Sequence, residues 1–207
     1  MAGPPLILVP TAPERERLLA LGALGGRQLE LCGFGPIAAA ARAASLLASC
    51  GSDRVLLLGI AGTLAPEQLA IGSAATFDAV HLDGVGAGEG TGRLSADAMG
   101  FAHWQDEEGA VGDSLPLVAR APTGSLLTVC AASATREQAE ERRTRTGALA
   151  EDMEAFGVAL ACRLHGARLT VVRGVSNRAG DRDVGRWRID EALEQAHRLG
   201  LETLAAW

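Results

Sequence analysis

The chain has 207 residues, of which 48% are hydrophobic and 21% are charged, and its formal net charge at pH 7 is -6. This length and composition predict one compact domain over residues 1–207, with a single buried core. The excess of acidic side chains argues against a polyanionic partner, so we expect no nucleic-acid binding. No apolar run reaches eighteen residues, and no basic stretch precedes the short apolar run at the start, so we expect neither a membrane span nor an export signal.

The four cysteines, Cys32, Cys50, Cys130 and Cys162, are widely separated and form no C-x-x-C pair. Neither a zinc site nor a disulfide framework is indicated by this spacing. We therefore expect reduced thiols and a cytoplasmic location.

Short apolar runs alternate along the chain with longer Ala- and Leu-rich stretches, which is typical of buried parallel strands connected by helices. The pattern predicts an α/β fold. The predicted strands are Leu6–Val9, Gln28–Cys32, Val55–Gly59, Ala74–Val80, Leu126–Cys130 and Leu169–Val175. The predicted helices are Glu14–Leu24, Ile37–Cys50, Arg136–Thr146, Met153–His165 and Arg188–Leu204.

The stretch between Asp83 and Asp113 is rich in glycine and acidic residues and is longer than an ordinary connection. It is either an excursion that faces a substrate or a flexible surface loop. Composition does not decide between the two.

Two glycine turns follow predicted strands. The segment Gly33–Ala38 superficially matches the dinucleotide-binding fingerprint, but the acidic Asp53 precedes the next strand instead of ending it, so a strand-to-helix turn is the better interpretation. Gly59–Gly62 would let backbone N–H groups approach a ligand closely, or it is a structural turn. The serine-hydrolase, zinc-protease and P-loop motifs are absent.

The most informative segments are Glu151–Cys162 and Val171–Asp183. Met-Glu at a helix start, a small-residue helix, a strand and then Ser-Asn at the strand's end resemble the purine nucleoside phosphorylase and nucleosidase superfamily. Gly59–Gly62 is similar to the glycine-rich active-site turn of that superfamily, and Thr11–Glu14 follows the first strand where its nucleosidases carry a catalytic glutamate. The resemblance implies a three-layer αβα fold with a central mixed, largely parallel twisted sheet.

Within the superfamily, Ser176, Asn177, the segment Gly180–Asp183 and Trp187 are most similar to the futalosine hydrolases of the alternative menaquinone pathway. This resemblance spans nearly the whole chain. It implies hydrolysis of the N-glycosidic bond of futalosine, with release of hypoxanthine and dehypoxanthinyl futalosine. The resemblance also implies that this reaction needs no cofactor and no metal. Members of the superfamily are commonly oligomers, so we expect a homo-oligomer and take a homodimer as the first hypothesis.

Cleavage of a purine N-glycosidic bond makes the ribose oxocarbenium-like while electron density moves into the base. By resemblance Glu14 deprotonates the attacking water, although an acid in a first helical turn is also favoured by the helix dipole. Glu154 corresponds to the glutamate that accepts from the ribose hydroxyls, and Met153 to an apolar contact with the sugar. We interpret Glu151 and Asp152 as ordinary charges near a helix start. The other implied substrate contacts are Ala61, Gly62, Ser176, Phe101 and Arg182.

Asn177 stands where adenine-specific relatives carry an aspartate. An amide can accept from a protonated N7 and donate to a 6-oxo group, whereas a carboxylate suits a 6-amino group and repels a carbonyl oxygen. The sequence therefore favours hypoxanthine as the leaving base. The alternative interpretation is an Asn that merely terminates a strand.

Several alternatives stay open at this point. Phosphorolysis would need cationic donors near the glycine turns, and no Arg lies between Gly59 and Gly92, which favours water as the nucleophile. A methylthioadenosine- or aminodeoxyfutalosine-type nucleosidase, a purine nucleoside phosphorylase and a non-catalytic nucleoside-binding domain remain alternative functions.

Two substrate contacts are not assigned to one residue. Thr135 falls where adenine-specific nucleosidases place a stacking Phe, so the apolar wall against the base would come from Phe101, Phe156 or Phe34. Futalosine carries a carboxylate, for which the candidate partners are Arg136, Arg178 and Arg182.

Overall fold

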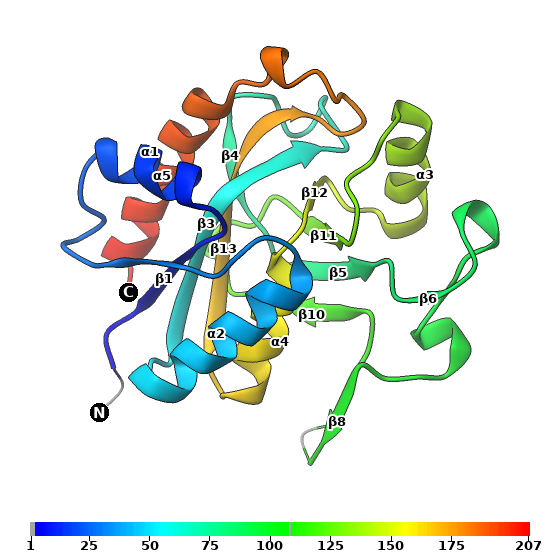
Figure 1. The fold of residues 1–207 in the computed structure, drawn as a ribbon, viewed down its shortest axis with the longest axis horizontal. Helices are drawn as coiled ribbons and strands as arrows, with labels where there is room; N and C mark the ends of the chain where they lie inside the picture. The colour runs from blue at the N-terminus through cyan, green and yellow to red at the C-terminus, as the bar shows by residue number, and fades with distance from the viewer. Residues whose placement is uncertain (1–2, 108) are drawn as a thin grey trace.

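The structure is a computed structural model that describes residues 3–107 and 109–207. Its helices are α1 (Ala12–Ala20), α2 (Pro36–Cys50), α3 (Arg136–Thr146), α4 (Ala155–Leu164) and α5 (Ile189–Ala205), with short 3-10 turns at Gly90–Gly92, Asp97–Met99 and Val184–Arg186 (Figure 1). The strands are β1 (Leu6–Val9), β2 (Leu29–Leu31), β3 (Arg54–Thr63), β4 (Ala74–Thr76), β5 (Ala79–Asp83), β6 (Gly86–Ala87), β7 (Leu94–Ser95), β8 (Trp104–Asp106), β9 (Gly109–Val111), β10 (Ser114–Pro116), β11 (Ser125–Val129), β12 (Ala150–Asp152) and β13 (Arg168–Arg178). In the described residues, no helix is both long and apolar enough to cross a membrane.

The central sheet has nine strands in the order β10-β5-β11-β12-β3-β1-β2, with β13 paired along β3 and β4 paired to β13. The pairs of β1 with β2 and β3, of β11 with β5 and β12, and of β13 with β3 are parallel. The pairs of β10 with β5, β12 with β3 and β13 with β4 are antiparallel. This mixed, largely parallel sheet confirms the predicted fold class.

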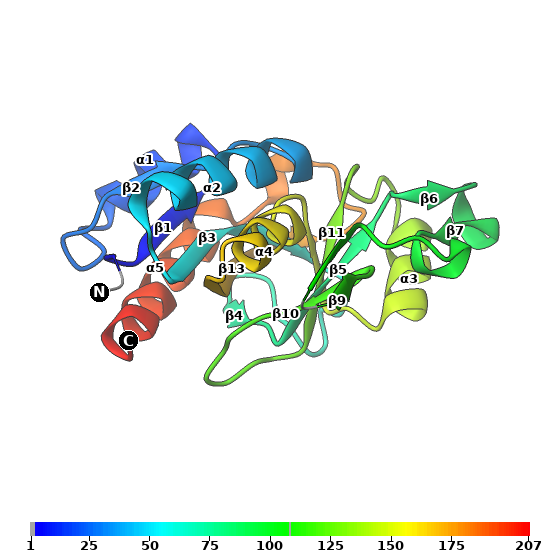
Figure 2. The ribbon, with the colours of Figure 1, turned by 90° about the horizontal axis from the view of Figure 1, so that it is seen from below.

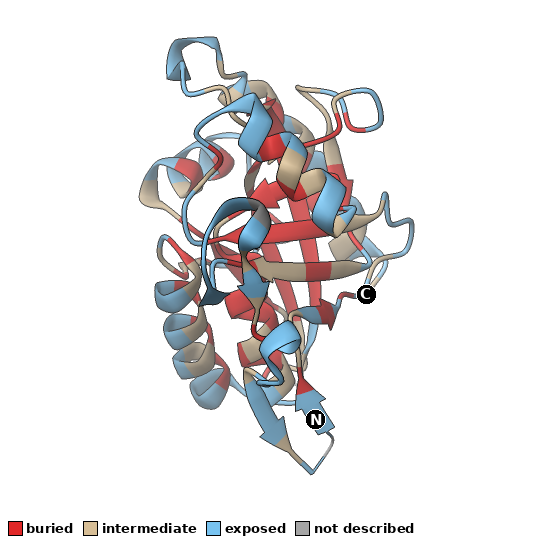
Figure 3. Cartoon of the chain, turned by 90° about the vertical axis from the view of Figure 1, so that its right-hand side faces the viewer, coloured by how far each residue is buried: buried red, intermediate tan, exposed pale blue. Residues whose placement is uncertain are grey.

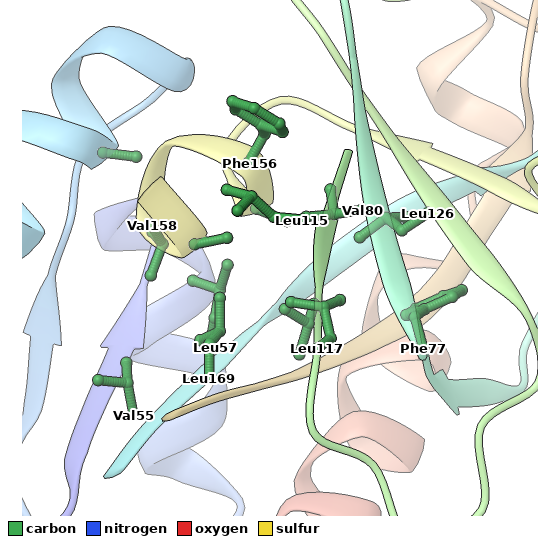
Figure 4. Close-up of a cluster of buried hydrophobic side chains, with 14 of the residues drawn as sticks. Val55, Leu57, Phe77, Val80, Leu115, Leu117, Leu126, Phe156, Val158 and Leu169 are labelled. Carbon is green, nitrogen blue, oxygen red and sulfur yellow. The ribbon is translucent and has the colours of Figure 1, made fainter. Parts of the chain in front are cut away.

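The long central strands β3 and β13 are apolar on both faces because helices cover both sides of the sheet. In β3, Val55 and Leu57 belong to the core cluster under α2 and α4, whereas Leu56 and Leu58 belong to the cluster under α1 and α5. Figure 2 shows α2 and α4 on one side of the sheet and α5 on the other. Figure 4 shows the first cluster, where Phe156 of α4 lies close to side chains of the strands.

Helices α2 and α4 approach each other closely at Gly157. A Cβ on this residue would stand 2.2 Å from the carbonyl oxygen of Pro36, in the first turn of α2. Only a glycine accommodates this contact without a shift of backbone. The packing fixes the start of α2 and hence the preceding Gly35, which lies at a φ of 85°.

The structure differs from the predicted elements in several details. The predicted strand Ala74–Val80 is two strands, because the chain turns at Phe77 and Asp78 and Asp78 N–H donates to Gly124. Strand β12 was not predicted, since its sequence, Ala-Glu-Asp, is acidic although all three residues are buried. Helix α4 begins at Ala155, so Met153 and Glu154 precede it instead of lying within it.

The stretch from Asp83 to Asp113 forms two small hairpins, β6–β7 and β8–β9, that extend from the body of the molecule (Figure 1). Figure 3 views the molecule from that side, with exposed residues of the hairpins in front of the buried strands. Most of the described residues there are exposed or half-buried. The segment is therefore a structured surface excursion.

Candidate active site

A cavity of about 440 Å³ lies at the carboxyl ends of β1, β3 and β13, the edge at which open α/β sheets bind ligands. It is formed by the start of α1, the Gly59–Gly62 end of β3, the β12–α4 connection and the loop that follows β13. Its lining residues are Pro10, Thr11, Pro13, Glu14, Arg17, Phe34, Ile60, Ala61, Gly62, Val129, Ala132, Glu151, Asp152, Met153, Glu154, Ser176, Asn177, Arg182, Val184, Trp187 and Ile189.

Glu14 is a buried carboxylate held by two donors. Thr11 caps α1 and places Glu14 in the first turn of the helix. The Glu14 Oε2 atom accepts from Thr11 Oγ1 at 2.5 Å, and its Oε1 atom accepts from the backbone N–H of Ile60 at 3.0 Å. These contacts fix the carboxylate against the glycine turn of β3.

Glu154 lines the same cavity as Glu14 and lies just before the first residue of α4. Its Oε1 atom accepts from the Gly35 N–H at 3.1 Å, and its Oε2 atom lies 3.3 Å from Nη2 of Arg173. Arg173 also donates through Nε and Nη2 to Oδ2 of Asp152, at 3.0 and 2.5 Å. We call Glu14, Asp152, Glu154 and Arg173 the catalytic-side cluster.

The Arg173 guanidinium is fully buried in the middle of β13, and its Nη1 atom has no hydrogen-bond partner among the described residues. A Cβ on Gly59 would stand 2.2 Å from this Nη1 atom and 2.9 Å from Oε1 of Glu14. The missing side chain of Gly59 therefore brings an unsatisfied cationic donor and a carboxylate to the same place. Buried donors are rarely left unpaired, and Arg173 does not line the cavity, so an ordered water is the expected partner of this one.

The electrostatics of the cluster follow from burial. Burial lowers the pKa of Arg173, but the carboxylates of Asp152, Glu154 and Glu14 outweigh it and raise that pKa above its usual value. Burial raises the pKa of Glu154 to about 7, with Asp152 and Glu14 adding to the rise while Arg173 and the Gly35 N–H oppose it. Glu154 thus changes charge near neutral pH.

Asn177 lies at the end of β13, just after a β-bulge that leaves Ser176 without a partner in β3. Its Oδ1 atom accepts from Ser176 Oγ at 2.8 Å. Its Nδ2 atom donates to the carbonyl of Arg178 at 2.9 Å and lies 3.5 Å from that of Asp181. The amide is therefore oriented, yet one lone pair of Oδ1 and one weakly engaged N–H remain for a ligand.

A second buried charge cluster lies beyond β12, and we call it the Arg142 cluster. Arg142 of α3 donates through Nε to Asp83 at 3.0 Å, through Nη2 to Ala131 O at 3.0 Å and through Nη1 to Ser133 Oγ at 2.8 Å. Its Nη1 also lies 3.3 Å from Oε2 of Glu151. Every nitrogen of this guanidinium has a partner.

The structure brings most of the predicted site residues to the cavity: Glu14, Ala61, Gly62, Met153, Glu154, Ser176, Asn177 and Arg182. It does not bring Phe101 there, because this residue follows the 3-10 turn at Asp97–Met99 in the surface excursion and is 64% exposed. None of the described residues between Asp83 and Asp113 lines the cavity.

The same geometry reduces the candidates for the apolar wall against the base and for the partner of the substrate carboxylate. Of the three phenylalanines considered for the apolar wall, Phe34 lines the cavity, whereas Phe156 is buried under α4 with its ring edge-on to His103 at 5.5 Å. Of the arginines considered for the substrate carboxylate, Arg182 lines the cavity and lies 5.4 Å over the Trp187 ring, while Arg178 pairs with Glu140.

Sequence reasoning missed Arg173 and did not place Trp187 and Arg17 in the cavity. A signal for Arg173 was present, since a lone Arg inside the apolar run Leu169–Val175 must find a buried partner. Its carboxylate partner Asp152 lies on β12, which the sequence did not reveal as a strand. Among the described residues, no group of three or more His, Cys, Asp or Glu side chains is arranged to hold a metal ion.

Comparison with known proteins defines the class first. The family model of the phosphorylase superfamily matches residues 5–205 of the chain. The structure is similar to the 5'-methylthioadenosine/S-adenosylhomocysteine nucleosidase of Helicobacter pylori in complex with butyl-thio-DADMe-Immucillin-A, with a TM-score of 0.77, 16% identity and coverage of 100% and 99% of the two chains. The chain belongs to the phosphorylase superfamily, which confirms the superfamily resemblance.

Curated relatives then narrow the family. The chain is 37% identical to the futalosine hydrolase of Streptomyces coelicolor over 180 residues, which covers 81% of this chain and 74% of the relative. It is 31% identical to the futalosine hydrolase of Thermus thermophilus, with coverage of 84% and 79%. The native futalosine hydrolase of Helicobacter pylori shares the fold, with a TM-score of 0.75 at 16% identity and coverage of 98% and 97%. Within the superfamily, the chain falls in the futalosine hydrolase family.

Proposed function

We propose that this chain is an N-glycosyl hydrolase that cleaves futalosine to hypoxanthine and dehypoxanthinyl futalosine, a reaction of the alternative menaquinone pathway. The curated relatives carry this activity in their names. The observation that carries the proposal is the catalytic-side cluster, in which three buried carboxylates line a cavity that also contains Asn177, with the buried Arg173 guanidinium behind them.

Glu14 is the group that activates water in this mechanism. Its carboxylate is fixed by Thr11 and Ile60, and the unpaired Nη1 of Arg173 lies beside the same glycine turn. A water between them would donate to Glu14 and accept from Arg173, so its lone pair would be oriented while Glu14 removes its proton. The positive charge of Arg173 also offsets the repulsion among the three carboxylates.

Glu154 and Met153 hold the ribose. When ionised, Glu154 accepts hydrogen bonds from the sugar hydroxyls, and its negative charge favours the developing oxocarbenium ion. Its fixed contact with the Gly35 N–H sets the position of the carboxylate. Met153, which lines the cavity next to it, supplies an apolar contact for the sugar face.

Asn177 receives the leaving base. As the bond between C1′ and N9 breaks, N7 takes a proton from solvent water; the free Oδ1 lone pair of Asn177 accepts from this N7–H, and its weakly engaged N–H donates to the 6-oxo group. Phe34 and Trp187 line the same cavity and offer apolar surface to the purine. Arg182, which stacks on Trp187, is the candidate partner for the carboxylate of the substrate.

Water is favoured over phosphate as the nucleophile because the backbone N–H that would bind an anion at the glycine turn is already engaged by Glu14, and Arg173 does not line the cavity. The Ile60 N–H donates to Glu14, and a phosphate beside that carboxylate would be repelled. Arg17, at the cavity rim, pairs with Asp190 at 2.8 Å. A nucleosidase of the methylthioadenosine type is the second candidate, because the fold is shared with such an enzyme.

The test is incubation of the purified protein with futalosine, inosine and methylthioadenosine, each with and without phosphate. We expect hypoxanthine from futalosine, a free sugar product and no dependence on phosphate, identified by chromatography. A ribose-1-phosphate-type product that requires phosphate, or adenine release from methylthioadenosine as the dominant reaction, would contradict the proposal.

We further propose that residues 1–207 form one catalytic domain and that it acts as a homodimer in the cytoplasm. Exposed apolar side chains, including Phe34 and Ile37 beside the cavity end of α2, support association of two copies. The four cysteines are all free, which supports a reducing compartment. Light scattering of the purified protein tests the oligomeric state.

A further inference from the structure

One row of residues crosses the sheet at the cavity. In β12, Glu151 is the register partner of Gly62 in β3, and Asn177 in β13 is the partner of the same glycine on its other side. Register partners in adjacent strands direct their side chains to the same face of a sheet. Glu151 and Asn177 therefore flank Gly62 on one face, with their Cα atoms on the order of 10 Å apart, given a strand spacing of about 4.8 Å.

Gly62 leaves the space between the two side chains open. A Cβ at this position would stand 3.5 Å from Nδ2 of Asn177 and 3.4 Å from the backbone of Ala179. All three residues of the row line the cavity. A flat ring placed over Gly62 would thus have the Asn177 amide at one edge and the Glu151 carboxylate at the other.

Glu151 keeps a free acceptor site. Its Oε1 atom accepts from Ser133 N–H at 2.9 Å, and its Oε2 atom accepts from Ser133 Oγ at 2.6 Å and lies 3.3 Å from Nη1 of Arg142. The two oxygens of a carboxylate offer about four acceptor sites, so three donors leave one. Glu151 forms an ion pair with Arg142, and a carboxylate can only accept hydrogen bonds.

A buried acceptor discriminates between purines at N1. A 6-oxopurine carries a hydrogen on N1, whereas N1 of a 6-aminopurine is an acceptor and would face the carboxylate with repulsion. One side chain that hydrogen-bonds N7 and O6 and a second that hydrogen-bonds N1 would together recognise the whole edge of the purine that carries the 6-oxo group.

We infer that Glu151 is a specificity-determining residue that accepts the N1–H of the 6-oxopurine base, opposite Asn177. The inference rests on the proposed function and names the group that selects its substrate. Ser133 and Arg142 position the carboxylate, and neither needs to contact the substrate. Glu151 is then more than a charge near a helix start.

The test compares kcat/KM for futalosine and for aminodeoxyfutalosine, its 6-amino analogue, in the wild type and in Glu151→Gln. The Gln amide would donate to N1 of the aminopurine and oppose the N1–H of the oxopurine, so we expect the futalosine preference to fall about 10- to 100-fold. Glu67→Gln is the matched control, because it makes the same change at an exposed glutamate outside the cavity lining, and its preference should stay within about twofold of the wild type.

A purely structural role for Glu151 predicts a different result, in which Glu151→Gln lowers kcat/KM equally for both substrates and leaves the preference unchanged; that outcome would overturn the inference. If Glu151→Gln does not fold, Glu151→Asp keeps the charge beside Arg142 and withdraws the carboxylate by one methylene, and the same fall in preference is expected. A wild type that does not hydrolyse futalosine contradicts the proposed function itself, which separates the two failures.

Discussion

Arg142 and Arg173 are both buried, but they differ in how completely their side chains are hydrogen-bonded. Arg142 satisfies all three of its nitrogens within the protein, through Asp83, Ser133 and a backbone carbonyl. Arg173 binds two carboxylates, but its Nη1 atom has no partner within residues 3–107 and 109–207. Both side chains have little or no exposure to solvent, so burial alone does not separate them.

The two clusters differ in whether every nitrogen of the guanidinium has a hydrogen-bond partner among the described residues. A guanidinium whose nitrogens are all paired offers nothing to a ligand and contributes to the architecture, whereas Arg173 carries a desolvated donor whose cost is recovered when water binds it. We therefore expect the loss of Arg142 to appear mainly in stability and changes in the catalytic-side cluster mainly in turnover.

The largest expected effect is on turnover, from Glu14→Gln. The amide keeps the shape of the side chain and can still accept from the Ile60 N–H and donate to Thr11, but it cannot take a proton from water. We expect kcat to fall about 10²- to 10⁴-fold, with the midpoint of urea unfolding almost unchanged. Near-normal turnover in the folded variant would place the general base elsewhere.

The largest expected effect on stability comes from Arg142→Met. The change leaves Asp83 and Glu151 buried with fewer donors, which should lower the free energy of unfolding by about 3–5 kcal/mol. Urea denaturation followed by circular dichroism measures it. A loss below about 1 kcal/mol would mean that the Arg142 cluster is not a structural support.

A smaller effect is expected from Asn177→Asp, which adds a carboxylate to the cavity. It should reduce kcat/KM for futalosine more than for aminodeoxyfutalosine, because a carboxylate faces the 6-oxo group with repulsion. A lost or repulsive buried contact is worth about 1–3 kcal/mol, or about one to two orders of magnitude in the ratio. An unchanged ratio would show that Asn177 does not read the six-position.

The smallest effect is a pH dependence. Because the pKa of Glu154 is raised to about 7, the carboxyl group is ionised above that pH and protonated below it, where it no longer accepts from two sugar hydroxyls. We expect kcat/KM, which reports the free enzyme, to fall as the pH drops through about 7, by about tenfold per unit below it. Glu154→Gln should abolish this limb, and a limb at the same pH in that variant would assign it to another group.

Sequence patterns could predict the layers of this fold because buried strands such as β1 are short apolar runs and helices are longer stretches rich in helix-forming residues. The bounds of β1 and α3 were predicted correctly. They could not predict β12, whose acidic residues are tolerated in the interior only because Arg173, Thr128 and Ser133 are brought to them from other elements. The prediction that differed most from the structure was that Phe101 contacts the substrate. This residue lies in the surface excursion, where the geometry of two hairpins, and not a periodic sequence pattern, determines where each side chain lies.

The same limit applies inside the site. Motifs placed Glu14, Glu154 and Asn177 correctly at one cavity, since strand ends of a parallel sheet meet at one edge. The interpretation of Glu151 as an ordinary charge could not be improved from the chain alone, because its neighbours across the sheet depend on the register of β12 with β3.

The close contact between Gly157 and Pro36 limits how far the Glu154 carboxylate can be displaced. The backbone N–H that holds Glu154 belongs to Gly35, one residue before α2, and the position of α2 is set by a helix crossing with no room for a methyl group. A larger residue at position 157 would move the start of α2 outward and carry that N–H away from the carboxylate. The position of Glu154, the residue that we propose to hold the ribose, is thus tied to a helix crossing whose residues do not line the cavity, and redesign for bulkier sugars would begin there.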